Sequence, residues 1–402
     1  MTTEISASPE INLEAEQADT QDKHAHWAGV VSMSLGVFAL VTAEFLPASL
    51  LTPMASGLQI SEGAAGQAVT ATAIVALVTS LLISVVIGAL NRRLVLIGFS
   101  LLLIVSNLIV AAAPGLTTIL VGRILLGVAL GGFWTLSTAT VMRLVPTDAV
   151  PRALAIVFMG VSAATVVAVP VGSYLGALIG WRGVFVAASG LGVVAALIQF
   201  ATLPSLPARN RRSLNVLLDV MRRPGIGIGM LAVLLVFAGH FTFFTYIRPF
   251  LEDVTHVQVA GVTAILFAFG IANFIGTYLV AYVIEHSLRF ALLLMPMVMV
   301  VLALSLSAFG GIPALDAALI AIWGLVFAGV PVSWSTWITR TLSDEAETGG
   351  GLIVAAINLA IAIGAGFGGF LLETVGSRGV FAASGAICLI ATVIILARVK
   401  AK

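Results

Sequence analysis

Three ionisable side chains, Glu44, Arg123 and His240, lie within long apolar stretches of the sequence. A charge at the centre of a bilayer costs about 2.5 to 3.5 kcal/mol on insertion scales, so such residues usually have a partner or a function. A carboxyl group that is buried beside an arginine is under two opposing influences and can take up and release a proton. These residue types therefore predict a proton-coupling site in which Glu44 carries the proton and Arg123 tunes it.

Helix geometry places the three residues at a similar depth. With a rise of about 1.5 Å per residue, Glu44 lies roughly 24 Å and His240 roughly 21 Å above the starts of their helices, and Arg123 lies roughly 9 Å below the far end of its own. His240 therefore joins the predicted coupling site. Two other interpretations stay open: Glu44 and Arg123 form a purely structural ion pair, or His240 is a neutral hydrogen-bonding residue in a packed seam.

Aromatic, amide and hydroxyl side chains accompany this layer in the segments LGGFW, GHFTFFTYIRP and VPVSWSTWITR. Such groups can stack on and hydrogen-bond a flat polar molecule such as a nucleobase. The predicted substrate-binding residues are Phe133, Trp134, Phe241, Phe244, Tyr246, Arg248, Asn273, Trp334 and Asn358. The alternative is ordinary packing, with Arg248 extending to the membrane interface and Trp323, Trp334 and Trp337 in an interfacial aromatic belt.

Other chemistry finds no support in the sequence. The three lysines lie outside the apolar stretches, so no phosphate-binding Walker A motif exists, and HExxH, paired CxxC and GxSxG motifs are absent. The single cysteine, Cys388, cannot form an internal disulfide or a thiolate metal site. A net charge of +1 without a basic stripe excludes nucleic-acid binding. We expect no enzyme activity, no cofactor and no metal.

The composition requires a membrane protein. The chain is 60% hydrophobic and 9% charged, with a mean hydropathy of +1.15, whereas a soluble domain carries roughly a quarter charged residues. We expect an all-α membrane protein of twelve transmembrane helices in two six-helix bundles. The predicted helices span 27–51, 64–90, 94–113, 117–141, 153–178, 184–203, 226–251, 259–284, 290–310, 314–338, 351–373 and 380–398.

The predicted domains follow from composition and charge. They are a disordered acidic tail over 1–26, a bundle over 27–203, a linker over 204–225, a second bundle over 226–398 and a short tail over 399–402. With the N-terminus in the cytoplasm, 15 of the 19 basic residues fall on the cytoplasmic side, which favours cytoplasmic termini and linker. Of the other four, Arg123 and Arg248 fall within helices, and Arg182 and Arg378 fall in loops of the opposite side.

An internal repeat and a set of small residues indicate how the halves are built. Arg182 begins RGVFVAASG and Arg378 begins RGVFAASG, with 378 − 182 = 196 residues between them, about half the chain. Such a repeat is typical of transporters made of two like bundles. Small residues at four-residue spacing, including Gly364 and Gly368, predict close helix contacts. The residues assigned to packing and conformational change are Gly127, Gly131, Pro170, Gly172, Arg92 and Arg93.

Several segments together resemble one family. They are EFLPASLLTPMA from Glu44, RILLG with Arg123, LGGFW, WRGVF, FFTYIRP and PVSWSTWITR, and the likeness covers roughly residues 27–400. The chain is similar to bacterial drug:proton antiporters of the major facilitator superfamily, and among them to exporters of purine ribonucleosides. The resemblance implies export of nucleosides such as inosine and guanosine, and of purine analogues, in exchange for protons. It also implies that the Pro170–Gly172 patch belongs to the antiporter motif of the fifth helix.

One loop departs from the family pattern. Between the second and third helices the family carries Gly-x-x-x-Asp-Arg-x-Gly-Arg-Arg, whereas this chain has GALNRRLVL with Asn91 in place of the aspartate. The usual charge latch between this loop and the eleventh helix therefore lacks its aspartate. We expect Arg92 and Arg93 to bind the acids Asp344, Glu345 and Glu347 on the same face instead.

These observations predict a monomeric, proton-coupled exporter of purine ribonucleosides in the bacterial inner membrane that works by alternating access. Helices one, four, seven and ten would line its central cavity. One alternative is a sugar or multidrug exporter of the same superfamily. The other is a membrane sensor that binds a ligand without transporting it, although such a sensor usually carries a soluble output domain.

Overall fold

A computed structural model describes residues 25–88, 90–146, 149–207, 219–342 and 346–399. The predicted acidic tail up to residue 24, residues 208–218 of the central linker and residues 400–402 lie outside this described part. Within it the chain is helical, and ten helices are long and apolar enough to cross a membrane, with mean hydropathies of 1.8 to 2.7. Their apolar runs exclude water, so the helix ladder satisfies their backbone groups.

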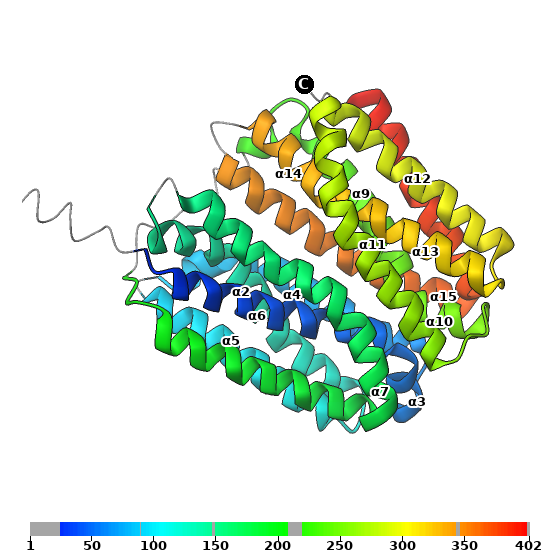
Figure 1. Cartoon of the computed structure of the whole chain (residues 1–402), viewed down its shortest axis with the longest axis horizontal. Coiled ribbons are helices and arrows are strands. Elements are labelled where there is room, and N and C mark those ends of the chain that lie inside the picture. Colours follow the sequence, from blue (N-terminus) through cyan, green and yellow to red (C-terminus); the bar gives the residue numbers. More distant parts are fainter. Residues whose placement is uncertain (1–24, 89, 147–148, 208–218, 343–345, 400–402) are drawn as a thin grey trace, which may run out of the picture.

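Two bundles of helices lie side by side (Figure 1). The N-terminal bundle holds α2 (Trp27–Ser49), α3 (Leu51–Leu58), α4 (Glu62–Val86), α5 (Arg92–Ala111), α6 (Leu116–Leu144) and α7 (Val150–Thr202). The C-terminal bundle holds α9 (Ile226–Thr245), α10 (Ile247–Asp253), α11 (Val259–His286), α12 (Leu288–Phe309), α13 (Pro313–Phe327), α14 (Gly329–Thr341) and α15 (Ala346–Arg398).

The two longest helices each contain two spans. Both α7 and α15 are 53 residues long, and each is interrupted by one glycine with a positive φ angle, Gly180 (φ 74°) and Gly376 (φ 71°). A side chain would disfavour this conformation, so glycine permits the chain to turn there. Splitting α7 and α15 at these glycines turns the ten candidate spans into twelve, as predicted. The glycines are 376 − 180 = 196 residues apart, the offset of the sequence repeat.

The repeated arginines fasten these turns. Arg182 Nη2 donates to the carbonyl of Ala113 at the end of α5 (2.7 Å), and Arg378 Nη2 donates to the carbonyl of Gly310 at the end of α12 (2.7 Å). Carbonyls at a helix end lack intrahelical donors, so each arginine satisfies an orphan acceptor. This shared role explains why the motif recurs.

Proline divides three further spans. We predicted single helices over 27–51, 226–251 and 314–338, but each is broken into two helices: α2 and α3, α9 and α10, and α13 and α14. Every break lies three residues before a proline, which has no amide hydrogen and clashes with the preceding turn. The breaks and their prolines are Leu50 and Pro53, Tyr246 and Pro249, and Ala328 and Pro331.

Glycines allow helices to approach closely within each bundle. A Cβ atom at Gly127 of α6 would lie 2.6 Å from the Thr72 carbonyl of α4, and one at Gly364 of α15 would lie 2.7 Å from the Ala238 carbonyl of α9. Gly131 of α6 likewise faces the backbone of Ala76. The prediction that these glycines serve packing is confirmed at these contacts.

The bundles adjoin at the end of the molecule that holds α3 and α10, and they diverge toward α14 (Figure 1). We name the end with α3 and α10 the closed end. Here Ser61 Oγ donates to the carboxylate of Glu373, and a Cβ atom at Gly63 would lie 2.7 Å from the Gly369 carbonyl. Glycine on both α4 and α15 therefore lets the two bundles touch through their backbones.

Candidate functional site

Arg123 is bound to the backbone of the N-terminal bundle. Its Nη1 donates to the Ala43 carbonyl at 2.8 Å, its Nη2 to the Glu44 carbonyl at 3.2 Å and its Nε to the Ala68 carbonyl at 3.2 Å. The Ala43 carbonyl would ordinarily accept from the amide four residues later, but that residue is Pro47. The fully buried guanidinium replaces the donor that Pro47 lacks.

Glu44 lies beside Arg123, as predicted, but the two side chains do not form an ion pair within the described structure. A salt bridge within this part of the chain joins Arg248 and Glu252 instead. The half-buried Glu44 side chain instead lines a small pocket between the bundles. The other lining residues are Phe45, Ala48, Val69, Phe241, Phe244, Thr245 and Ile361. The interpretation of Glu44 and Arg123 as a structural ion pair is therefore wrong, because the guanidinium donates to backbone carbonyls and not to the carboxyl group.

His240 lies in an aromatic enclosure of the C-terminal bundle. Trp323 Nε1 donates to His240 Nδ1 at 3.1 Å, the imidazole stacks on Phe327 with ring centroids 3.3 Å apart, and Phe244 stacks at 5.4 Å. Because an indole N–H only donates, Nδ1 must act as an acceptor, and the ring proton belongs on Nε2. This hydrogen bond therefore holds His240 as a neutral imidazole whose one donor is Nε2–H.

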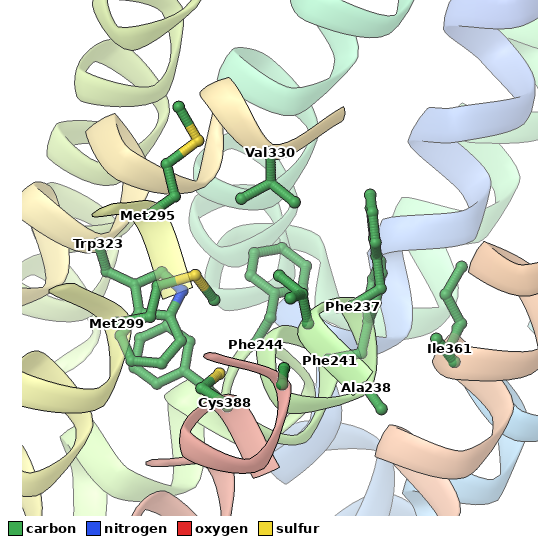
Figure 2. Close-up of a cluster of buried hydrophobic side chains, with 14 of the residues drawn as sticks. Phe237, Ala238, Phe241, Phe244, Met295, Met299, Trp323, Val330, Ile361 and Cys388 are labelled. Atoms are coloured by element: carbon green, nitrogen blue, oxygen red, sulfur yellow. The ribbon is translucent and has the colours of Figure 1, made fainter. Parts of the chain in front are cut away.

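Trp323 was missed as a site residue. We considered an interfacial belt of Trp323, Trp334 and Trp337, but they are only 0%, 1% and 2% exposed and pack inside the C-terminal bundle. Figure 2 shows Trp323 beside Met299, near the aromatic side chains of α9. Sequence spacing cannot tell a tryptophan at a lipid interface from one buried against a histidine of another helix.

Glu44 and His240 occupy corresponding positions of the two halves. Their separation, 240 − 44 = 196 residues, equals that of the repeated arginines. Each precedes the break of its span by six residues, since the breaks lie at Leu50 and Tyr246. The repeat could have revealed this pairing from sequence.

The predicted aromatic residues separate into two groups. Phe241 and Phe244 line the pocket with Glu44, and Phe244 contacts Phe45 of the other bundle edge to face, with centroids 5.5 Å apart. Phe133 instead lies in the core of the N-terminal bundle, against Gly36. Trp134 is half-buried and packs on Phe158 of α7 at 5.8 Å. The structure thus brings Phe241 and Phe244 to Glu44, but not Phe133 or Trp134.

The predicted amide groups have local partners. Asn273 Nδ2 of α11 donates to the Gly324 carbonyl of α13 at 3.0 Å, and Asn358 Nδ2 donates to the Val354 carbonyl of its own helix at 2.9 Å. Trp334 packs edge to face on Trp337. In this conformation Asn273 joins two helices of the C-terminal bundle, whereas Asn358 and Trp334 contact residues of their own helices.

Tyr246 and Arg248 lie at the closed end, away from the Glu44 pocket lining. Tyr246 is fully buried, and its hydroxyl donates to the Ala365 carbonyl at 2.6 Å. Arg248 binds Glu252 of its own helix at 2.8 Å and donates across the bundles to the Ser49 carbonyl. In this conformation both side chains are engaged by protein groups.

Arg92 and Arg93, which were predicted to act in conformational change, bind backbone carbonyls of the N-terminal bundle. Arg92 donates to the Gly88 and Leu90 carbonyls, and Arg93 donates to the Phe200 carbonyl at 2.6 Å. The acids expected to bind them, Asp344, Glu345 and the side chain of Glu347, lie outside the described residues.

Asn91, which replaces the family's aspartate, has a clear role. Its Oδ1 accepts from the amides of Arg93 and Leu206, each at 3.0 Å, and so caps α5 and secures the chain that leaves α7.

The fifth span packs tightly on the first through its proline–glycine segment. A Cβ atom at Gly172 would lie 2.6 Å from Ser49 Oγ, so glycine is needed for this approach. Pro170, two residues earlier, is buried and leaves the Val166 carbonyl without its helical donor. Gly270 of α11 approaches that carbonyl from the other bundle, since its Cβ would lie 3.1 Å away.

Comparison with known proteins identifies the class that this fold and site define. The family model of the Major Facilitator Superfamily matches residues 33–355, and the chain belongs to this superfamily of membrane transporters. The protein is therefore a multi-pass membrane transporter and not an enzyme.

Relatives in Salmonella are described as the purine ribonucleoside efflux pump NepI. The chain is 46% identical to the protein of Salmonella typhimurium over 375 residues, which cover 93% of this chain and 94% of the relative. The protein of Salmonella paratyphi B is 45% identical over the same length.

Solved structures share the fold at low sequence identity. A mutant of the nucleoside transporter NupG superposes with a TM-score of 0.74 at 14% identity, covering 93% of this chain and all of that chain. A D-xylose–proton symporter superposes with a TM-score of 0.73 at 16% identity, covering 93% of this chain and 97% of that one. These likenesses confirm the predicted fold.

Proposed function

We propose that this protein exports purine ribonucleosides, such as inosine and guanosine, across the bacterial inner membrane in exchange for protons. The observation that carries the proposal is the 46% identity with a purine ribonucleoside efflux pump over nearly the whole of both chains. Transport proceeds by alternating access of a site between the bundles to the two sides of the membrane. The protein acts as a monomer, with both termini in the cytoplasm.

Glu44 is the proposed proton carrier. Its carboxyl group lines the pocket between the bundles, and Arg123 is occupied by backbone carbonyls rather than by the carboxylate. Protonation therefore does not require an ion pair to break. Arg123 stabilises the backbone that positions Glu44, and its neighbouring positive charge is proposed to tune the carboxyl group.

The proposed substrate contacts combine the aromatic residues of α9 with His240. Phe241 and Phe244 offer faces for stacking a purine ring near Glu44. The Nε2–H of a neutral His240, with Nδ1 held by Trp323, offers a donor for a purine or ribose acceptor. Trp134, Asn273, Trp334 and Asn358 join this site only if another conformation exposes them.

Counterflow in proteoliposomes tests this function. Vesicles loaded with unlabelled inosine should accumulate labelled inosine, and an imposed proton gradient should drive net transport. Cytidine and xylose serve as matched competitors. Counterflow of labelled xylose in xylose-loaded vesicles, without counterflow of inosine, would favour the sugar-export alternative, and competition by unrelated drugs would favour multidrug export. Cysteine labelling at Ser213 tests the orientation, since reaction from outside intact cells would contradict it.

A further inference from the structure

A buried hydrogen-bonded connection between the bundles is centred on Arg248. This residue is 4% exposed at the closed end, and its Nη1 donates to the carbonyl of Ser49 in the N-terminal bundle. The same nitrogen lies 3.4 Å from Ser173 Oγ of α7, and Ser173 also bonds Thr263 of α11 at 3.3 Å. Ser49 and Ser173 are both fully buried, so water does not compete for these bonds.

The Ser49 carbonyl is available because of a proline. In a continuous helix it would accept from the amide of residue 53, but Pro53 has no amide hydrogen and the first span is broken at Leu50. A buried carbonyl without a donor is costly. Arg248 supplies the donor from the opposite bundle, in the same way that Arg123 supplies one for the carbonyl freed by Pro47.

Opening the closed end must separate Arg248 from Ser49 and Ser173, because these residues belong to different bundles. The charge is not stranded by this step, since Arg248 Nε keeps its 2.8 Å bond to Glu252 on the same helix. The Ser49 carbonyl then becomes accessible to water. The separation therefore breaks hydrogen bonds but no ion pair, which makes the contact reversible.

We propose that Arg248 and the Pro53-freed carbonyl of Ser49 form the gate latch that holds this end of the transporter shut. The latch acts in the conformational cycle whatever molecule the chain carries. Arg248 is accordingly a conformational residue in the described state rather than a substrate contact. Pro53 is part of the device, since an amide at position 53 would compete with Arg248 for the same carbonyl.

Distances between spin labels test the latch. Labels on cysteines placed at Ser56 of α3 and Ala314 of α13, both exposed at the closed end, report its opening. Labels at Ala201 of α7 and Thr339 of α14 report the opposite end. The full-length chain is labelled in nanodiscs without substrate, in a background with Cys388→Ala. Pulsed electron-spin measurements give the populations of short and long distances, so failure to transport purines would not affect the result.

Arg248→Gln should raise the ratio of open to closed populations at the Ser56–Ala314 pair roughly tenfold or more, the ratio expected for a lost charge-assisted hydrogen bond. Pro53→Ala should shift it in the same direction, and the pair at the opposite end should move closer. Ser173→Ala removes one acceptor without disturbing the charge and should produce a smaller shift in the same direction. This variant tests the latch if Arg248→Gln does not fold.

Pro296→Ala is the matched control, because it restores an amide in α12 within the C-terminal bundle and away from the latch. It should leave both distance distributions unchanged. Unchanged populations in Arg248→Gln, or a shift in Pro53→Ala no larger than that in Pro296→Ala, would overturn the proposal.

Discussion

Arg123→Ala should destabilise the N-terminal bundle through one carbonyl. Of the three carbonyls that Arg123 contacts, that of Ala68 also accepts from Thr72 Oγ1 at 3.0 Å, and that of Glu44 faces the next turn of its own helix. The Ala43 carbonyl has no such donor, because the residue four positions later is Pro47. Leaving one buried acceptor unpaired costs about 1 to 3 kcal/mol.

A double-mutant cycle isolates this cost. In Pro47→Ala the new amide can donate to the Ala43 carbonyl, so a following Arg123→Ala should cost less than it does in the native chain. We expect a coupling free energy of about 1 to 2 kcal/mol, which exceeds the usual error of additivity of about 0.5 kcal/mol. Equilibrium unfolding in mixed detergent micelles, followed by tryptophan fluorescence, gives the four free energies.

A second cycle provides the control. Pro296→Ala restores an amide in α12, far from Arg123, so its effect should add to that of Arg123→Ala without coupling. Additive effects in the Pro47 cycle would refute the assignment of Arg123 to the proline-freed carbonyl. They would return the residue to a role centred on the charge of Glu44.

Three further outcomes are expected. Glu44→Gln should fold and exchange substrate but lose proton-driven export, measured as uphill transport at several external pH values; full export with an unchanged pH profile would move the proton route to His240. Trp323→Phe should raise KM for inosine about fivefold with little change in kcat, because one hydrogen bond of about 1 kcal/mol that fixes His240 is lost; an unaltered KM would show that this bond does not serve binding. Arg378→Ala should lower the free energy of unfolding by about 1 kcal/mol, because the Gly310 carbonyl loses its donor. A loss of transport at an unchanged free energy of unfolding would contradict an anchoring role.

Much of the architecture follows directly from the sequence. Long apolar runs must be helices in a membrane, because no water is present to satisfy their backbone groups. The repeated arginine motif indicates two like halves, and glycines at four-residue spacing indicate which helix faces touch. The breaks of three spans were also encoded, since each lies three residues before a proline, but their exact place depends on which carbonyls find a new donor.

The partners of the buried charges were decided only by the tertiary structure. Depth along a helix correctly placed Glu44 beside Arg123, yet depth carries no information about rotation around the helix axis. The guanidinium therefore binds backbone freed by Pro47, whereas the carboxyl group faces a pocket. Likewise, Trp323 reaches His240, and Arg248 reaches Ser49, across helices far apart in the chain. Residue type and spacing determine which groups need a partner, and only the packing of the helices determines which partner each one meets.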